Sequence, residues 1–264
     1  MKLTITEKGK KDIFISLFQL LKNCTNIINI MFHEGDMYIQ GMDKSHVCLF
    51  DIKILTAWFG TYEVAKAQNI CVDSNIFHNV LSMTQEHHKM VIYFDDAVEP
   101  DQLNIDLLNK NEGGKDFDKY FKIPLTELEV DILQIPDTEY DADFSILSKK
   151  MHEITSQLMF FGDTMNIECS EDNIILGSSG VNGKMNVNIP IDDLSEYSIS
   201  EGEKVRVSYS LNYIHKMCLT TKISNEIYFS ISDKLPIKIK YDLGASSYLV
   251  FYIAPKMNDD DDDN

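Results

Sequence analysis

Three groups of residues in this sequence have types and spacings that could support chemistry. The first is residues 177–184, which read Gly-Ser-Ser-Gly-Val-Asn-Gly-Lys. Glycine-rich loops that end in Gly-Lys cradle phosphates in nucleotide-binding proteins. Here one residue too many separates Gly177 from Gly183-Lys184, and Met185 stands where Ser or Thr would bind magnesium. The spacing therefore favours a turn between two strands over a phosphate-binding loop.

The other two groups are histidines and carboxylates. The His87-His88 side chains diverge because the residues are adjacent, and no third ligand follows at the spacing of a zinc site. The pairs Asp95-Asp96 and Asp141/Asp143 could serve acid–base catalysis or metal binding, but no nucleophile or histidine pattern accompanies them. We interpret them as solvated loop acids. The sequence predicts no catalytic residue, no metal site and no cofactor. One alternative stays open, an enzyme whose active site matches no motif that we recognise.

Composition describes a soluble globular protein. The 264 residues are 44% hydrophobic and 25% charged, with room for two domains of ordinary size. No apolar run approaches about 18 residues and the N-terminus lacks a signal-peptide layout, so we expect an intracellular protein that avoids membranes. The five cysteines form no Cys-x-x-Cys pair. They indicate neither a zinc knuckle nor a disulfide framework, and we expect most of them to be buried hydrophobes.

Four short stretches carry helical periodicity, and most of the remaining chain alternates like strands. The predicted helices are 10–24, 74–83, 148–160 and 210–219. Their expected buried faces are Ile13, Leu17, Leu20, Leu21 and Cys24; Ile76, Phe77, Val80 and Leu81; Met151, Ile154, Leu158 and Met159; Leu211, Ile214, Met217 and Cys218. Two helices and several strands in each half predict an α+β fold.

The two halves repeat each other. Residues 29–39 resemble residues 166–176, Asn75–His78 resembles Asn212–His215, and the triplet Ile-Tyr-Phe occurs at 92–94 and at 227–229. A repeat this long indicates a duplicated domain, since solenoid units are much shorter. We therefore predict an N-terminal domain (1–124), an extended connecting loop (125–140), a C-terminal domain (141–257) and a disordered acidic tail (258–264).

Charge is unevenly distributed over the chain. The formal net charge is −18, and the tail contributes five consecutive aspartates. The predicted helices have the opposite balance, since residues 8–22 hold four lysines against one aspartate. This split predicts either a basic surface on an acidic body or ordinary solvated helix faces.

Two segments resemble a known family. They are Gln40-Gly-Met-Asp-Lys-Ser-His-Val-Cys-Leu49 and Leu249-Val-Phe-Tyr-Ile-Ala-Pro-Lys-Met257, the second running into the acidic tail. Both resemble the eukaryotic-type DNA sliding clamp family, proliferating cell nuclear antigen (PCNA). Residues 133–140 resemble the family's interdomain connecting loop, and residues 178–180 and 233–236 also match its pattern. The resemblance covers essentially the whole chain in order.

The resemblance implies a homotrimeric ring of six similar domains around duplex DNA, with helices lining the hole. It implies a DNA polymerase processivity factor of replication and repair, without enzymatic activity, in the nucleus or a viral replication compartment. Its partners would be double-stranded DNA, bound without sequence preference, and a DNA polymerase, the clamp loader, a flap endonuclease and a DNA ligase, bound through peptide motifs. We expect the trimer interface to pair residues near 118–124 with residues near 183–189 of the next subunit.

The resemblance also maps a hydrophobic pocket for the partner peptides. Its expected residues are Met42, His46, Val47, Leu49, Leu133, Ile135, Pro136, Pro236, Tyr252, Ile253, Ala254 and Pro255. His46 and Ala254 would receive the glutamine end of the peptide. The loop lysine that receives ubiquitin in the family aligns with Glu171.

The DNA-facing residues depart from the family pattern. Basic residues of the family align here with Ile15, Ser16, Asn79, Ser82, Glu153, Ser156, Asn212 and Leu219. Lysines nearby are the expected substitutes, namely Lys10, Lys11, Lys22, Lys149, Lys150, Lys216 and Lys222. This thin basic lining motivates one alternative, a diverged clamp-like scaffold that binds partners without stably encircling DNA.

Overall fold

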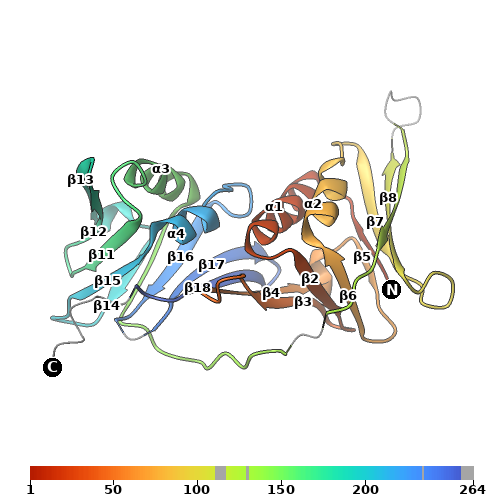
Figure 1. Ribbon diagram of the computed structural model, residues 1–264, viewed down its shortest axis with the longest axis horizontal. Helices are drawn as coiled ribbons and strands as arrows, with labels where there is room; N and C mark the ends of the chain where they lie inside the picture. The colour runs from red at the N-terminus through yellow and green to blue at the C-terminus, as the bar shows by residue number, and fades with distance from the viewer. Residues whose placement is uncertain (111–116, 129–130, 234, 257–264) are drawn as a thin grey trace. The chain divides into compact units, whose positions relative to one another are not determined.

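The computed structural model describes residues 1–110, 117–128, 131–233 and 235–256. The chain divides into two compact units (Figure 1). Unit 1 comprises 1–44, 50–133 and 242–249, and unit 2 comprises 45–49, 134–241 and 250–264. Relative to the predicted domains, the units exchange two short segments, 45–49 and 242–249. The predicted acidic tail lies outside the described residues.

The order of elements is the same in the two halves of the chain. The first half contains β1 (Lys2–Ile5), α1 (Lys8–Cys24), β2 (Ile27–Phe32), β3 (Asp36–Met42), β4 (Cys48–Leu55), η1 (Thr56–Trp58), β5 (Thr61–Glu63), β6 (Gln68–Asp73), α2 (Ser74–Ser82), β7 (His88–Tyr93), β8 (Gln102–Asn109) and β9 (Lys119–Pro124). The second half contains β10 (Ala142–Leu147), α3 (Ser148–Leu158), β11 (Thr164–Cys169), β12 (Asn173–Gly180), β13 (Gly183–Pro190), η2 (Ile191–Asp193), β14 (Glu196–Ile199), β15 (Val205–Ser210), α4 (Leu211–Met217), β16 (Glu226–Ile231), β17 (Ile237–Gly244) and β18 (Ser247–Ile253). The predicted α+β fold with two similar domains is confirmed.

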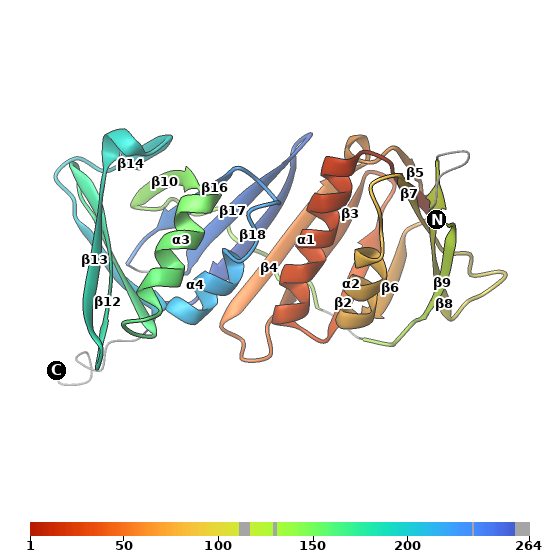
Figure 2. The same cartoon turned by 90° about the horizontal axis from the view of Figure 1, so that it is seen from above.

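In unit 1, helices α1 and α2 lie side by side over one face of a sheet with the order β4-β3-β2-β6 (Figures 1 and 2). A second sheet has the order β5-β1-β7-β8-β9. Aromatic rings join the helices, since the Phe18 centroid lies 4.9 Å from Phe14 on α1 and 4.6 Å from Phe77 on α2. The three rings are at most 1% exposed, so apolar burial holds the helix pair on the sheet.

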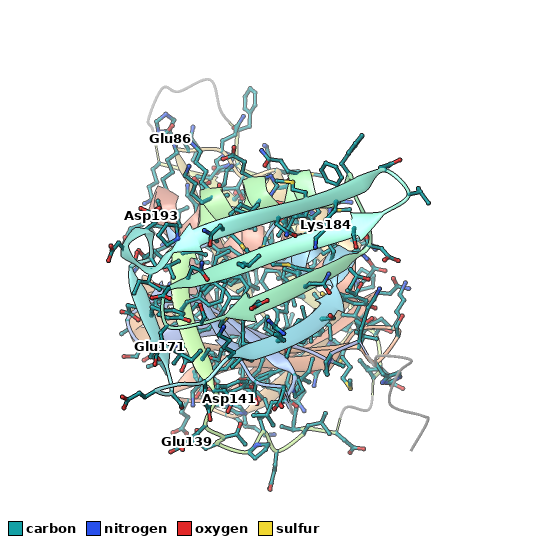
Figure 3. The ribbon with its side chains drawn as sticks, turned by 90° about the vertical axis from the view of Figure 1, so that its left-hand side faces the viewer. Glu86, Glu139, Asp141, Glu171, Lys184 and Asp193 are labelled. Carbon is teal, nitrogen blue, oxygen red and sulfur yellow. The ribbon has the colours of Figure 1, made fainter. Side chains whose placement is uncertain are left out.

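Unit 2 repeats this arrangement with α3 and α4. One sheet runs β14-β10-β16-β17-β18, and the other runs β13-β12-β11-β15. Strands β4 and β18 contribute residues to both units and are neighbours in the strand order. Figure 3 shows the four-stranded sheet face-on, with Lys184 over β13 and the acidic residues Glu171 and Asp193 toward the opposite end of the strands.

A pair of tyrosines shows the duplication at the level of single contacts. The Tyr62 hydroxyl, on β5, lies 2.9 Å from the backbone oxygen of His33, which directly follows β2, and can donate to it. The Tyr197 hydroxyl, on β14, donates to the backbone oxygen of Ser170 before the β11–β12 turn at 2.5 Å. Burial raises the pKa of both phenols above its ordinary value, so both remain protonated donors. The same type of tyrosine hydrogen bond thus joins equivalent segments in the two units.

The helix positions agree with the predictions, but three of the four buried faces differ. In α1 the chain buries Phe14 and Phe18, whereas Ile13 is half-exposed. The predicted burial of Ile76 and Met159 is wrong, since these side chains are 45% and 39% exposed, and Ile154 is only half-buried. The predicted face of α4 is confirmed in full. In α1, Phe14 provides more apolar area than its neighbour Ile13 and takes the core position. In α3 the fully buried neighbour of Ile154 is Thr155.

The structure also shows where the residues first considered for chemistry lie. Residues 181–182 form the turn between β12 and β13, as predicted, and Gly183 has a φ of 110° that favours glycine. All five cysteines are buried, and none forms a disulfide. His88 is fully buried, and its Nδ1 accepts from the Gln85 amide at 3.0 Å. No helix among the described residues is long and apolar enough to cross a membrane.

Candidate functional site

The predicted pocket residues are divided between the units, and the larger group lies in unit 2. The Ala254 amide donates to the Val47 carbonyl at 3.0 Å, so the segment around His46 lies beside the end of β18. His46 is exposed and has a φ of 55°. Such a backbone is uncommon for a residue with a side chain and turns His46 out of the strand that follows.

The remaining unit 2 residues differ in exposure. Val47, Leu49, Tyr252 and Ile135 are half-buried, and Pro136, Pro236, Ala254 and Pro255 are exposed. Ile253 is completely buried. We therefore correct its predicted role: its side chain belongs to the core and supports the strand, because β18 alternates its side chains between the two faces. Pro236 is held through its carbonyl, which accepts from the Tyr140 hydroxyl at 3.2 Å.

In unit 1 the pocket residues are Met42, half-buried at the end of β3, and Leu133, which is 47% exposed. The side chain of Gln40 fixes the backbone of Leu133 from both sides. Its Oε1 accepts from the Leu133 amide at 2.7 Å, and its Nε2 donates to the Leu133 carbonyl at 3.0 Å. Gln40 is only 4% exposed. These two hydrogen bonds satisfy the backbone donor and acceptor of Leu133 and leave its side chain at the surface.

Two further side chains hold Gln40 in place. Its Nε2 also donates to the Tyr38 hydroxyl at 2.9 Å, and that hydroxyl donates to Asp51 Oδ1 at 2.6 Å. Burial and the Asp51 carboxylate raise the pKa of Tyr38 above its ordinary value, so the hydroxyl keeps its proton. Sequence reasoning used Gln40 only as part of a motif and missed this network. The alternation of polar residues at 38 and 40 on one strand was the available signal.

The connecting loop is held by its backbone more than by its side chains. The amides of Leu125 and Thr126 donate to the carbonyls of Asp101 and Cys71 at 2.8 and 2.9 Å. The apolar side chains of Leu128 and Ile132 remain 42% and 44% exposed. The connector thus offers apolar side chains at its surface instead of docking them.

The predicted DNA-facing lysines differ in whether a neighbouring side chain binds their ammonium groups. Lys10 lies 3.2 Å from Glu7, and Lys22 donates to His78 Nδ1 at 3.0 Å. Lys149, Lys150, Lys216 and Lys222 are exposed in unit 2. Among the described residues, no carboxylate lies within salt-bridge distance of these four ammonium groups. The accessible positive charge of the candidate surface is therefore concentrated on α3, α4 and the segment after α4.

Lys11 corrects the prediction for α1. Its side chain is 2% exposed, and its Nζ donates to the carbonyls of Gln85, Glu86 and His88 at 3.1, 2.7 and 2.6 Å. Burial lowers the pKa of Lys11. Its ammonium group ties α1 to the loop before β7 and is not available to a ligand at the surface.

In the part of the chain that the structure describes, six strands lie at the edge of a sheet, namely β5, β6, β9, β13, β14 and β15, and two of them have large exposed apolar side chains beside them. They are β9, paired only with β8, and β13, paired only with β12. Large apolar side chains next to both edges are exposed: Phe117 (80%) and Tyr120 (68%) at β9, and Phe160 (68%) and Val181 (105%) at β13. Asn182 Nδ2 donates to the Phe160 carbonyl at 2.9 Å, which keeps the latter two in one patch. Open edges with apolar borders mark association surfaces.

Comparison with known proteins gives a consistent result over the whole chain. The family model described as "Proliferating cell nuclear antigen, N-terminal domain" matches residues 7–132, and the one described as "Proliferating cell nuclear antigen, C-terminal domain" matches residues 134–256. The chain belongs to the proliferating cell nuclear antigen family. PCNA-family proteins are sliding clamps, processivity factors of DNA replication and repair that act as scaffolds without enzymatic activity.

Individual PCNA proteins show the same relationship. The chain is 28% identical over 254 residues to proliferating cell nuclear antigen 2 of Plasmodium falciparum, covering 93% of this chain and 96% of that protein. It is 27% identical over 257 residues to proliferating cell nuclear antigen of Chaetomium thermophilum, covering 95% of each. The crystal structure of PCNA from Thermococcus kodakaraensis superposes with a TM-score of 0.86 at 17% identity, covering 97% of this chain and 99% of that one. PCNA-family clamps bind DNA, form homotrimers and recruit replication factors.

Proposed function

We propose that three copies of this chain close into a ring around duplex DNA, slide along it and carry replication and repair enzymes. The observation that carries the proposal is the pair of open edges, β9 and β13. By position in the repeated element order, β9 corresponds to β18 and β13 to β4. Since β18 and β4 are neighbours within the chain, the equivalent pairing between copies joins β9 of one subunit to β13 of the next.

This pairing is heterologous, because two different edges meet. Heterologous contacts form closed rings when the rotation between copies closes, and in such a ring every β9 and β13 edge is covered. It would also cover the apolar borders of both edges. Phe117 and Tyr120 of one subunit would meet Phe160 and Val181 of the next, which removes large apolar surfaces from water.

Light scattering at physiological salt across a dilution series tests the ring. We expect a particle of three times the 30.3 kDa chain mass, and a monomer for the double variant Phe117→Asp/Tyr120→Asp. Val98→Asp is the matched control, since Val98 is 72% exposed in the β7–β8 loop of unit 1, outside β9, and it should remain trimeric. A wild-type monomer at micromolar concentration would contradict the ring and favour the alternative, a clamp-like scaffold that binds partners without encircling DNA.

The contact with DNA would be electrostatic and independent of sequence. The exposed lysines of α3, α4 and the following segment can neutralise phosphates, and no base-reading arrangement is needed for sliding. The net charge of the whole chain, −18, disfavours DNA at other surfaces.

Partner docking would use the exposed pocket residues of unit 2 around His46 and Ala254. A short helical peptide with one aliphatic and two aromatic anchors would fill such a surface, its glutamine end meeting His46 and Ala254. The proposed partners are a DNA polymerase, the clamp loader, a flap endonuclease and a DNA ligase. We further propose a nuclear location, in keeping with the eukaryotic relatives from Plasmodium and Chaetomium.

A further inference from the structure

A stacked pair of histidines lies between the two helices of unit 2. His152 on α3 and His215 on α4 have ring centroids 5.6 Å apart and an interplanar angle of 21°. Both side chains are half-buried, and their helices carry the exposed lysines Lys149 and Lys216. No motif of the sequence marked this pair, because the two residues belong to different helices.

Hydrogen bonds fix which nitrogen of each ring carries the proton. His152 Nδ1 lies 3.1 Å from the Cys218 carbonyl, which can only accept, so Nδ1 is the protonated nitrogen. His215 Nδ1 lies 3.1 Å from Thr155 Oγ1, whose own proton goes to the carbonyls of Met151 or His152. The threonine oxygen therefore accepts from His215 Nδ1 as well. Within the described part of the chain, neither Nε2 atom has a hydrogen-bond partner.

The equivalent histidine of unit 1 differs in this respect. His78 occupies the position of His215 in the repeat, but its Nδ1 accepts from Lys22 at 3.0 Å and its Nε2 lies 3.2 Å from Ser82 Oγ. Both ring nitrogens of His78 are used, and the side chain is 9% exposed. In contrast to His78, the unit 2 pair combines partial exposure with Nε2 atoms that have no hydrogen-bond partner in the described part of the chain.

We propose that His152 and His215 form a phosphodiester-binding site that takes up a proton when DNA binds. The inference rests on the proposed contact between this helix surface and DNA. A phosphate oxygen within reach of Nε2 would accept a hydrogen bond from the protonated ring, and the imidazolium charge would partly replace the basic residues absent from this surface. The ligand is the phosphate backbone, so the site has no base preference.

The surroundings of His215 disfavour its protonated form in the free protein. The pKa of His215 is lowered by burial and by His152. The charged residues of the two helices are Lys149, Lys150, Glu153 and Lys216. Helix α3 packs on β10 and β16, and α4 packs on β11 and β15. The buried titratable groups of these strands, Cys169 and Tyr209, have pKa values raised by burial and stay uncharged. A bound phosphate would therefore be the main anion to favour protonation.

The test combines histidine NMR titration with DNA affinity of the full-length protein. On adding a short duplex, the pKa of His152 or His215 should rise, and each unit of rise corresponds to about tenfold tighter binding at low pH. The salt slope of log affinity should steepen by about 0.9 per added phosphate contact at pH 6 relative to pH 8. His152→Gln/His215→Gln should remove both effects, whereas His33→Gln, in the β2–β3 turn, should keep them.

Variants at Lys149 and Lys150 separate failure of this site from failure of the proposed function. If Lys149→Gln/Lys150→Gln weakens DNA binding while the histidine pKa values and the pH dependence stay unchanged, the histidine site is wrong and the DNA-facing surface stands. If neither the lysine pair nor the histidine pair affects DNA affinity, the helix surface does not contact DNA and both proposals are wrong.

Discussion

At the scale of single residues, the main finding is that buried polar side chains position exposed functional ones. Gln40 holds Leu133 by two hydrogen bonds and is itself held by Tyr38. A half-exposed leucine on a fixed backbone loses little further entropy when a peptide covers it, which favours binding.

Leu133 and its neighbour Ile132 give a matched pair for the peptide site. They are 47% and 44% exposed on the same connector, and only Leu133 is a predicted pocket residue. Leu133→Asp should weaken binding of a fluorescent partner peptide by about tenfold or more, the loss typical of an anchor. Ile132→Asp should bind normally. Equal effects on the anisotropy titration would mean that Leu133 has no specific role.

Histidine burial predicts how stability depends on pH. Burial lowers the folded-state pKa of His78 and His215 below the ordinary value of 6.5. The unfolded chain then binds these protons more tightly, so the free energy of unfolding should fall as pH falls through that value. Urea unfolding at pH 7.5 and 5.5 should show a smaller pH effect in His78→Gln and His215→Gln. An unchanged pH effect in both variants would contradict this assignment.

Residues also show where sequence reasoning reaches its limit. Lys11 fits the pattern of a solvated helix, and its burial depends on carbonyls of residues 85–88, which only the tertiary fold brings near. The flexible four-carbon side chain of lysine lets its ammonium group reach such carbonyls. The local sequence pattern does not indicate whether a lysine will be buried in this way.

At the scale of elements, periodicity predicted the four helices and the duplication, but not the register of the buried faces. Phe14 and Phe18 displaced Ile13 from the core of unit 1 because aromatic contacts between α1 and α2 decide the packing. The open edges β9 and β13 were expected only from the family resemblance. Their exposed apolar borders came from the structure, since the exposure of Phe160 or Val181 has no signal in the sequence.

Two turns support the apolar patch at β13. A Cβ at Gly162 would lie 2.5 Å from the Ser179 carbonyl oxygen, so the α3–β11 and β12–β13 turns are in close contact. Gly162→Ala should destabilise the fold by about 1–3 kcal/mol, the usual cost of overpacking, and weaken the trimer by displacing Phe160 and Val181. Gly35→Ala is the control, because a Cβ there meets nothing within 4 Å. Denaturation and light scattering should separate the two variants, and identical behaviour would refute the tight turn contact.

At the scale of the whole molecule, the chain is an acidic protein, and among the predicted DNA-facing lysines the exposed ones without a carboxylate partner lie on α3, α4 and the segment after α4. This arrangement suits a clamp that holds DNA by topology and contacts it weakly. The sequence predicted that positive charge lies on the helices and negative charge on the rest of the chain. The family resemblance predicted that these helices face DNA. The structure adds that Lys11 is buried and that His152 and His215 lie between the two helices of unit 2.

The most direct measurement of encirclement uses a linear duplex whose biotinylated ends can be blocked with streptavidin. Protein is added either before or after the ends are blocked, and retention on the duplex is measured after a high-salt wash that breaks electrostatic contacts. A ring should be retained only when it is added first and the ends are blocked afterwards, because threading needs a free end. Loss of the protein in both orders, or equal retention in both, would contradict encirclement.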